Sequence, residues 1–297
     1  MKHIFYILFT VLLIITSCKN NTSTEAPLTE GNSTVEPYKT PTATFITETL
    51  ELTHCESAVY DVENNIIYAS LIGNSEDGDG SIATVNMDGK LINAKFINGL
   101  NDPKGIAITK DRLYVSDVTE LVEADLATGT IIKKYTLDGI QFLNDIAIDD
   151  AGNVFVSDTS TSEIYRLDKE GHFSLWLAEI ALDNPNGLLI QDNIMYVASW
   201  GSQPNGGRVS RIDMVTKSID SISSIIGNLD GIRFYDENHM IISDWNSGNI
   251  HLIDHDGNTE QVLQVGQSVG DIAYIKEKDL LLLPMNKQSR LLFYKLK

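Results

Sequence analysis

The chain has 297 residues, of which 42% are hydrophobic, and its formal net charge is −19 at pH 7. That length can bury a large core within one domain, and propellers are among the folds that use it in this way. The excess of carboxylates argues against nucleic acid and against anionic membrane surfaces as partners, because both require clustered lysine and arginine.

Residues 1–17 have the pattern of a lipoprotein signal peptide. Lys2 supplies a positive charge, residues 4–15 form a short apolar run, and Ile15-Thr16-Ser17-Cys18 resembles a bacterial lipobox. This resemblance implies cleavage before Cys18, lipid on its thiol, and a domain anchored to a membrane of the bacterial cell envelope, outside the cytoplasm. A plain secretory signal or an uncleaved anchor is the alternative, although the run is short for a bilayer crossing.

Residues 18–41 would then comprise the lipidated cysteine and a flexible tether. The segment is rich in Asn, Thr, Ser, Glu and Pro, and it shows no apolar periodicity. With Cys18 carrying lipid, Cys55 is the one cysteine left in the folded part, so we expect no intramolecular disulfide.

From residue 42 to residue 297 the apolar residues alternate with period two between frequent turns, which predicts an all-β domain without amphipathic helices. One motif recurs, in which a turn-prone residue leads directly into an apolar strand. Its six copies start 40 to 48 residues apart, which is the length of one blade of four antiparallel strands. The sequence therefore predicts a six-bladed β-propeller.

The third copy shows the expected blade most clearly, with strands at 146–148, 154–156, 164–167 and around 173–177. The sixth copy has no fourth strand before the last residue. Residues 43–50 precede the first inner strand and have no other evident role. We therefore expect this N-terminal strand to complete the sixth blade and close the ring, which removes an unpaired edge.

The residues that begin the six inner strands should all face one mouth of the central channel. They are Glu56, Lys104, Asn144, Asn186, Asp230 and Gly270. Four of them offer side-chain oxygens, and convergence of two carboxylates with two amides is typical of a hard divalent cation site. Turn chemistry alone is an alternative explanation, because Asn, Asp and Gly suit tight turns. Glu56 favours the cation, since Glu has no such aptitude and a buried unpaired carboxylate is costly.

Four of these segments, in this order and spacing, resemble the gluconolactonase and regucalcin (senescence marker protein) family, which is related to paraoxonases and strictosidine synthases. The segments are Glu56-Ser57-Ala58-Val59, Phe142-Leu143-Asn144-Asp145, Asn184-Pro185-Asn186-Gly187-Leu188 and Leu229-Asp230-Gly231-Ile232. The resemblance covers residues from about 50 to the C-terminus. It implies a six-bladed propeller with one catalytic divalent metal ion in the channel, Ca²⁺ being favoured over Mg²⁺, Mn²⁺ or Zn²⁺.

The resemblance also implies residue roles. Glu56, Asn186 and Asp230 match the metal ligands of the family, Asn144 matches the asparagine that faces metal and substrate, and Asp230 stands where the family has its proposed general base. We therefore assign Asp230 and Asn144 as catalytic and include Asn144 in the metal set. The sugar-lactone members carry an arginine at the position of Phe142, and the aromatic ring here points to a more hydrophobic substrate.

Further residues complete the expected pocket. Lys104 either binds a substrate carboxylate or is a solvated lysine at the channel mouth. Trp200 and Trp245 occupy matching loops of adjacent blades, where they either wall a pocket or pack between blades. Cys55 has no identifiable catalytic partner, so we interpret it as a packed thiol.

The sequence thus predicts a divalent-metal-dependent lactonase or esterase acting on a small-molecule lactone or ester. Two alternatives stay open. Gly105-Ile106-Ala107-Ile108 followed by Leu113-Tyr114-Val115-Ser116-Asp117 also resembles an NHL repeat, so a non-catalytic propeller that binds a protein or another ligand is possible. A metal-binding lipoprotein without turnover at the cell envelope is the other.

Overall fold

The structure is a computed structural model, and it describes residues 38–74 and 76–297. Residues 39–297 form one compact unit. The predicted signal peptide, the predicted lipidation at Cys18 and the tether up to residue 37 lie outside the described residues. Within the described ranges no helix has the length and apolar character needed to cross a membrane.

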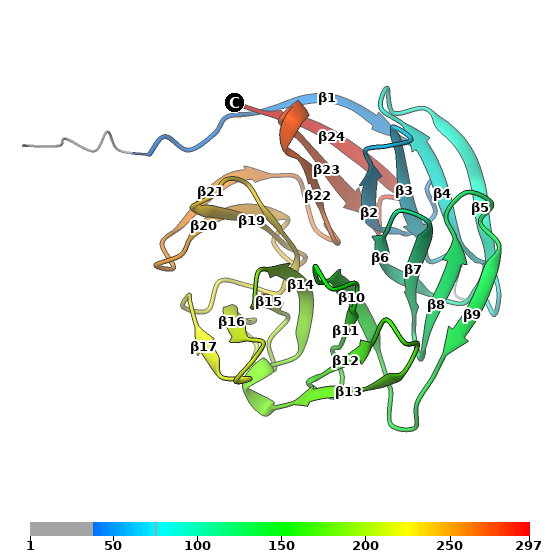
Figure 1. The fold of residues 1–297 in the computed structure, drawn as a ribbon. Helices are drawn as coiled ribbons and strands as arrows, with labels where there is room; N and C mark the ends of the chain where they lie inside the picture. The colour runs from blue at the N-terminus through cyan, green and yellow to red at the C-terminus, as the bar shows by residue number, and fades with distance from the viewer. Residues whose placement is uncertain (1–37, 75) are drawn as a thin grey trace, which may run out of the picture. The chain divides into compact units, whose positions relative to one another are not determined.

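Six four-stranded antiparallel sheets surround a central channel, as the predicted propeller requires (Figure 1). Numbered in chain order, the blades are blade 1 with β2 (Cys55–Asp61), β3 (Ile66–Leu71), β4 (Gly80–Asn86) and β5 (Leu91–Leu100); blade 2 with β6 (Pro103–Ile108), β7 (Arg112–Asp117), β8 (Glu120–Asp125) and β9 (Ile131–Tyr135); blade 3 with β10 (Leu143–Ile148), β11 (Val154–Asp158), β12 (Glu163–Leu167) and β13 (Phe173–Ala178); blade 4 with β14 (Pro185–Gln191), β15 (Ile194–Ser199), β16 (Val209–Asp213) and β17 (Ile219–Ser221); blade 5 with β18 (Leu229–Phe234), β19 (His239–Asp244), β20 (Asn249–Asp254) and β21 (Thr259–Gln264); and blade 6 with β22 (Ala273–Ile275), β23 (Leu280–Met285), β24 (Arg290–Leu296) and β1 (Ala43–Thr49).

The ring is closed by the strand that the sequence predicted for this purpose. β1 pairs antiparallel with β24, from Ala43 opposite Leu296 to Thr49 opposite Leu291. A ring contact between Phe45 and Tyr294, with centroids 5.6 Å apart, adds to this pairing. Blade 6 thereby gains its fourth strand, and β24 is left without an unpaired edge.

The hydrophobic core lies between neighbouring blades. Alternate residues of each strand point into these interfaces, as the period-two pattern requires. The buried Phe155 of blade 3 and Leu188 and Val197 of blade 4 belong to one such interface. The helices of the described residues are two short 3₁₀ turns, η1 (Ile180–Leu182) and η2 (Lys276–Lys278), which agrees with the all-β prediction.

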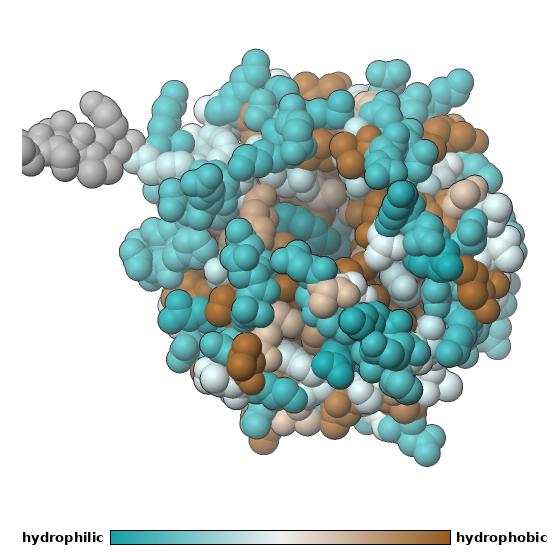
Figure 2. Space-filling view, in the orientation of Figure 1, coloured by the Kyte–Doolittle hydropathy of each residue, from teal (hydrophilic) through white to brown (hydrophobic). Residues whose placement is uncertain are grey.

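The inner strands approach one another closely around the channel. A Cβ atom on Gly187 would collide with the carbonyl oxygen of Asp230, and one on Gly231 would lie 2.4 Å from the amide nitrogen of Ile272. Because glycine has no Cβ, the strands can lie this close together. Figure 2 shows that the face of the ring drawn there is hollowed at its centre and rimmed mostly by polar residues.

The inner strand of blade 6 is irregular around Gly270. Regular pairing within its own sheet begins at Ala273, and before it the Gly270 amide donates to the Pro284 carbonyl of the same blade at 3.0 Å. The segment also bonds to blade 1, since the Asp271 amide donates to the Glu56 carbonyl at 2.8 Å and the Ala58 amide donates to the Asp271 carbonyl at 3.2 Å. The inner strands of the last and first blades are therefore joined directly beside the channel.

Removing β1 should test the closure. A chain that begins at Leu50 leaves the edge of β24 exposed, whereas a chain that begins at Lys39 keeps β1. Because several ladder hydrogen bonds are lost at about 1 kcal/mol each, we expect the shorter chain to lose at least about 3 kcal/mol of unfolding free energy and about 6–12 °C in Tm.

Thermal unfolding and size-exclusion chromatography of the two chains would measure this. The exposed edge should also cause self-association of the shorter chain. Equal Tm values and two monomers would contradict the role given to β1.

Candidate functional site

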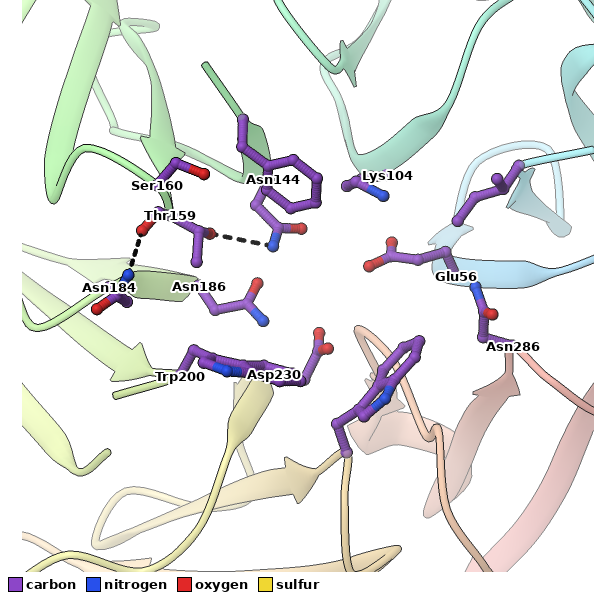
Figure 3. A pocket seen from close by; sticks show the side chains of 13 residues that line it. Glu56, Lys104, Asn144, Thr159, Ser160, Asn184, Asn186, Trp200, Asp230 and Asn286 are labelled. Carbon is purple, nitrogen blue, oxygen red and sulfur yellow. Dashed lines mark hydrogen bonds between the residues drawn. The ribbon is translucent and has the colours of Figure 1, made fainter. Parts of the chain in front are cut away.

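A cavity of about 500 Å³ opens at the end of the channel where the inner strands begin. Figure 3 shows its side chains converging from different blades. The residues that line it are Glu56, Ile72, Lys104, Phe142, Asn144, Thr159, Ser160, Asn184, Asn186, Trp200, Asp230, Trp245 and Asn286. The structure thus brings all eight predicted metal and pocket residues to one place.

The four oxygen-bearing residues owe their orientation to irregular backbone. Glu56, Asn144, Asn186 and Asp230 are each the second residue of an inner strand. In each of these strands the pairing register shifts at that position, as between Leu143 and Ile146 of β10. A bulge re-aims the side chain it carries, and here all four are buried and directed into the channel.

Burial leaves the two carboxylates poorly compensated. Desolvation raises the pKa of Glu56 to about 8, with Lys104 opposing the shift and Asp271 adding to it. Desolvation, followed by the charges of Glu56, Asp271 and Asp145, also raises the pKa of Asp230 well above its usual range. Burial is the main cause of both shifts, and the neighbouring carboxylates add to it.

The hydrogen bonds leave oxygen atoms of this set unused. Asn144 Nδ2 donates to Thr159 Oγ1 at 3.2 Å, and Asn186 Nδ2 donates to the Leu229 carbonyl at 3.3 Å. Both amide nitrogens are therefore turned towards protein acceptors. Glu56 Oε2 and Asn186 Oδ1 are buried and have no hydrogen-bond partner. Buried polar atoms are rarely left so.

This donor set fits a hard divalent cation. Two carboxylates and two amides offer only oxygen, which suits Ca²⁺, Mg²⁺ or Mn²⁺. Zn²⁺ fits less well, because the residues lining the cavity include neither histidine nor cysteine. In the described part of the chain, no group of three or more His, Cys, Asp or Glu is placed to hold a metal, so any cation here depends on the amide oxygens as well.

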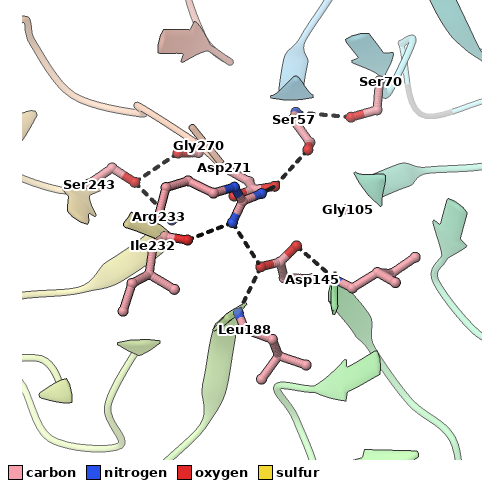
Figure 4. Close-up of polar contacts among 12 residues, drawn as sticks. Ser57, Ser70, Gly105, Asp145, Leu188, Ile232, Arg233, Ser243, Gly270 and Asp271 are labelled. Atoms are coloured by element: carbon pink, nitrogen blue, oxygen red, sulfur yellow. Dashed lines mark hydrogen bonds and ion pairs between the residues drawn. The ribbon is translucent and has the colours of Figure 1, made fainter. Parts of the chain in front are cut away.

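A second buried charge network lies further along the channel (Figure 4). Arg233 Nη2 lies 2.8 Å from Asp271 Oδ2, and Nη1 lies 3.8 Å from Asp145 Oδ2. Ser57 Oγ donates to Asp271 Oδ2 at 2.8 Å. Arg233 therefore compensates two buried aspartates here, whereas Glu56 and Asp230 have no comparable partner.

Hydrogen bonds connect this network to the backbone of the site. Asp145 follows Asn144, and its Oδ2 accepts the Leu188 amide of the next blade at 2.7 Å. Ser157 Oγ accepts the Asp145 amide at 3.0 Å and donates to the Asn186 carbonyl at 2.8 Å. The strands that carry Asn144 and Asn186 are thereby fixed to each other.

Neither the Arg233 network nor the serine bridges between blades were predicted from the sequence, although the sequence contains a pattern that indicates each of them. A serine occurs at the penultimate position of the second strand in four blades, at Ser70, Ser116, Ser157 and Ser243. Ser243 Oγ repeats the bridge of blade 3, accepting the Gly231 amide and donating to the Gly270 carbonyl at 2.8 Å each. Arg233 is a charged residue on an inner strand, which itself calls for a buried partner.

The predicted pocket residues form the walls of the cavity. Trp200 and Trp245 both line it, with ring centroids 6.4 Å apart. Lys104 is only 7% exposed, and its Nζ lies 3.0 Å from Asp102 Oδ1 and 4.7 Å from the centre of the Phe142 ring. The interpretation of Lys104 as a solvated lysine is therefore wrong.

Cys55, which we predicted to be a packed thiol, and two aspartates of neighbouring loops have structural roles. Cys55 is fully buried, and desolvation followed by the charge of Glu56 raises the pKa of its thiol, so it is not a nucleophile. Asp117 accepts the Asn101 and Asp102 amides, and Asp158 accepts the Gln141 and Phe142 amides. These rim aspartates shape the loops that position Asp102 and Phe142.

Comparison with solved structures places the chain among six-bladed propellers of low sequence identity. A gluconolactonase from Xanthomonas campestris has 14% identity and a TM-score of 0.67, covering 88% of this chain and 96% of that one. Virginiamycin B lyase from Staphylococcus aureus has 13% identity and a TM-score of 0.63, covering 86% and 100%. A streptogramin B lyase structure has 12% identity and a TM-score of 0.64, covering 86% and 98%.

These likenesses show the fold. No protein-family model and no curated protein matches this sequence. The expected relationship to paraoxonases and strictosidine synthases stays a prediction.

Replacing Arg233 with methionine tests the buried charge network of Arg233, Asp145 and Asp271. The variant leaves Asp145 and Asp271 buried without their cation, so we expect a loss of about 3–5 kcal/mol in unfolding free energy. Urea unfolding measures it. Arg211→Met is the matched control, because Arg211 forms an exposed ion pair at 3.7 Å with Asp220; its effect should stay within about 0.5 kcal/mol. Equal effects of the two substitutions would show that the network contributes nothing.

Proposed function

We propose that this protein is a hydrolase of lactones or related esters that depends on one divalent metal ion, with Ca²⁺ favoured, held by Glu56, Asn144, Asn186 and Asp230. One observation carries the proposal. Two buried carboxylates and unpartnered oxygens of Glu56 and Asn186 meet at the floor of a cavity large enough for a small molecule. Such an arrangement is unfavourable unless a cation neutralises it.

The reaction class draws support from the fold and the walls. The Xanthomonas campestris protein that shares the propeller is named as a gluconolactonase. In this chain Phe142, Trp200 and Trp245 give the cavity aromatic walls. We therefore propose a less hydroxylated, more apolar substrate than a sugar acid lactone.

Each residue of the proposed site would have its own role in the hydrolysis. When bound, the cation supplies Lewis-acid polarisation of the ester carbonyl. Asp230 accepts the proton of the attacking water, as a general base within reach of the cavity. Asn144 and Asn186 contribute amide oxygens and hold the substrate in register with Asp230. The aromatic walls exclude bulk water from the reacting ester.

The proposed location rests on the N-terminal pattern. Lipid on Cys18 would anchor the protein to a membrane of the bacterial cell envelope, with the propeller outside the cytoplasm. Lipid labelling of the expressed protein, with Cys18→Ser as the comparison, tests this part of the proposal.

Metal binding has a distinctive signature in the neutral variants Glu56→Gln and Asp230→Asn. Calorimetry should find one Ca²⁺ per wild-type chain and an affinity lower by roughly 100-fold or more in either variant. Without metal, both variants should melt at a higher temperature than the wild type at neutral pH, because the wild type must either bury an uncompensated carboxylate or protonate it on folding, and the amides avoid both costs. With Ca²⁺, only the wild type should gain Tm.

Glu48→Gln is the matched control, since Glu48 is a partly exposed carboxylate on β1 paired with Arg290. It should bind Ca²⁺ like the wild type. Unchanged Ca²⁺ affinity in Glu56→Gln and Asp230→Asn would remove the metal from the proposal.

Catalysis is tested separately with Asp230→Ala and Asn144→Ala. We expect Asp230→Ala to abolish turnover of a lactone panel while the circular dichroism spectrum stays that of the wild type. Asn144→Ala should lower kcat/KM by about 10- to 1,000-fold, because it removes one positioning and ligand group. A chelator should inactivate the wild type, and Ca²⁺ should restore it. Unchanged lactone hydrolysis by Asp230→Ala would refute the assignment.

A further inference from the structure

Lys104 is the one member of the ring of strand-start residues that brings a positive charge to the cavity. It is buried and lines the cavity, and Figure 3 shows it between Glu56 and Asn144. An ammonium group has three donors. Asp102 Oδ1 accepts one of them at 3.0 Å, and among the described residues the other two have no hydrogen-bond acceptor.

A buried ammonium with unused donors calls for an anion. Burying charge without hydrogen-bond partners is costly, and the face of Phe142 at 4.7 Å offsets only part of that cost. Asp102 holds the ammonium from outside the cavity, with its own side chain 35% exposed and therefore screened by water. The remaining donors are available to a ligand inside the cavity.

The charges of the cavity specify the sign of that ligand. Among its lining residues only Glu56, Asp230 and Lys104 are ionisable, which gives a net charge of −1 when all are charged. One divalent cation at the proposed ligands changes this to +1. A substrate with one negative charge would balance this lining charge, and Asp102, which lies outside the lining and is 35% exposed, offsets only part of the charge of Lys104.

We propose that Lys104 determines specificity and that the natural substrates are lactones or esters that carry a carboxylate next to the scissile ester and an apolar remainder. This inference rests on the proposed function and adds the substrate class. Lys104 binds the carboxylate through a charge-assisted hydrogen bond. The ester lies at Glu56, Asn144, Asn186 and Asp230. The apolar part packs against Trp200 and Trp245.

A matched pair of lactones tests the proposal: 5-oxotetrahydrofuran-2-carboxylate and its uncharged carboxamide. Hydrogen bonds to charged groups correspond to about 10- to 100-fold in equilibrium terms. We therefore expect the Ca²⁺-loaded wild type to prefer the carboxylate by about that factor in kcat/KM. Lys104→Met should remove this preference, chiefly through KM, while Lys104→Arg should retain most of it.

Lys133→Met is the control, because Lys133 also lies over an aromatic ring, that of Tyr135 at 4.3 Å, but on the exposed strand β9. It should leave the preference unchanged. Binding provides a readout without turnover. By calorimetry, 3-phenylpropanoate should bind the Ca²⁺-loaded wild type about 10- to 100-fold more tightly than 3-phenylpropanamide, and Lys104→Met should reduce this ratio towards the value set by the metal alone.

The possible results distinguish a wrong role for Lys104 from a wrong proposed function. If the wild type hydrolyses both lactones equally, or Lys104→Met keeps the full preference in both assays, the role of Lys104 is wrong and the hydrolase proposal stands. If neither lactone nor any member of the lactone panel is hydrolysed, the proposed function fails. In that case the calorimetric ratio alone still supports or overturns Lys104 as the carboxylate-binding residue.

Discussion

The structure depends on how buried negative charge is compensated along the channel. Four buried carboxylates, those of Glu56, Asp145, Asp230 and Asp271, face the axis, against the two cationic side chains of Lys104 and Arg233. Each pair of carboxylates has one cation, but the contacts differ. Arg233 is bonded to Asp271 and lies 3.8 Å from Asp145, whereas the ammonium of Lys104 is bonded to Asp102 and not to Glu56 or Asp230. Glu56 and Asp230 are therefore the less directly compensated pair.

Close strand packing is what allows that charge to be concentrated. Glycines at positions such as Gly187 and Gly231 let inner strands touch, and bulges turn the adjacent side chains inward. Serine bridges at Ser116, Ser157 and Ser243 then connect their blades to the next one. Side chains from blades far apart in sequence are thereby held without a continuous core beneath them. Their positions are set by backbone contacts, which resist displacement better than loops do.

Much of the fold was readable from the sequence because it repeats. The period-two pattern and the spacing of the motif fixed the number of blades, and the missing outer strand pointed to β1. The convergence of Glu56, Asn144, Asn186 and Asp230 followed from their equivalent places in the repeat. The repeat does not show, however, how deeply a side chain is buried or which side chain it pairs with. The burial of Lys104 and the pairing of Arg233 with Asp145 and Asp271 depend on side-chain contacts between distant blades. Such contacts produce no repeating pattern in the sequence. The lipid anchor and the metal stay predictions.

The pairing of β1 with β24 has a consequence for biosynthesis. A ribosome makes β1 among the first strands of the domain and its partner last, so the two come together across almost the whole length of the domain. Until β24 has emerged from the ribosome, β1 has an open hydrogen-bonding edge and no native partner strand. We therefore expect β1 to pair with β24 late in folding, because contacts between residues far apart in the sequence form slowly. A nascent chain stalled before residue 290 would present β1 to chaperones or to other nascent copies.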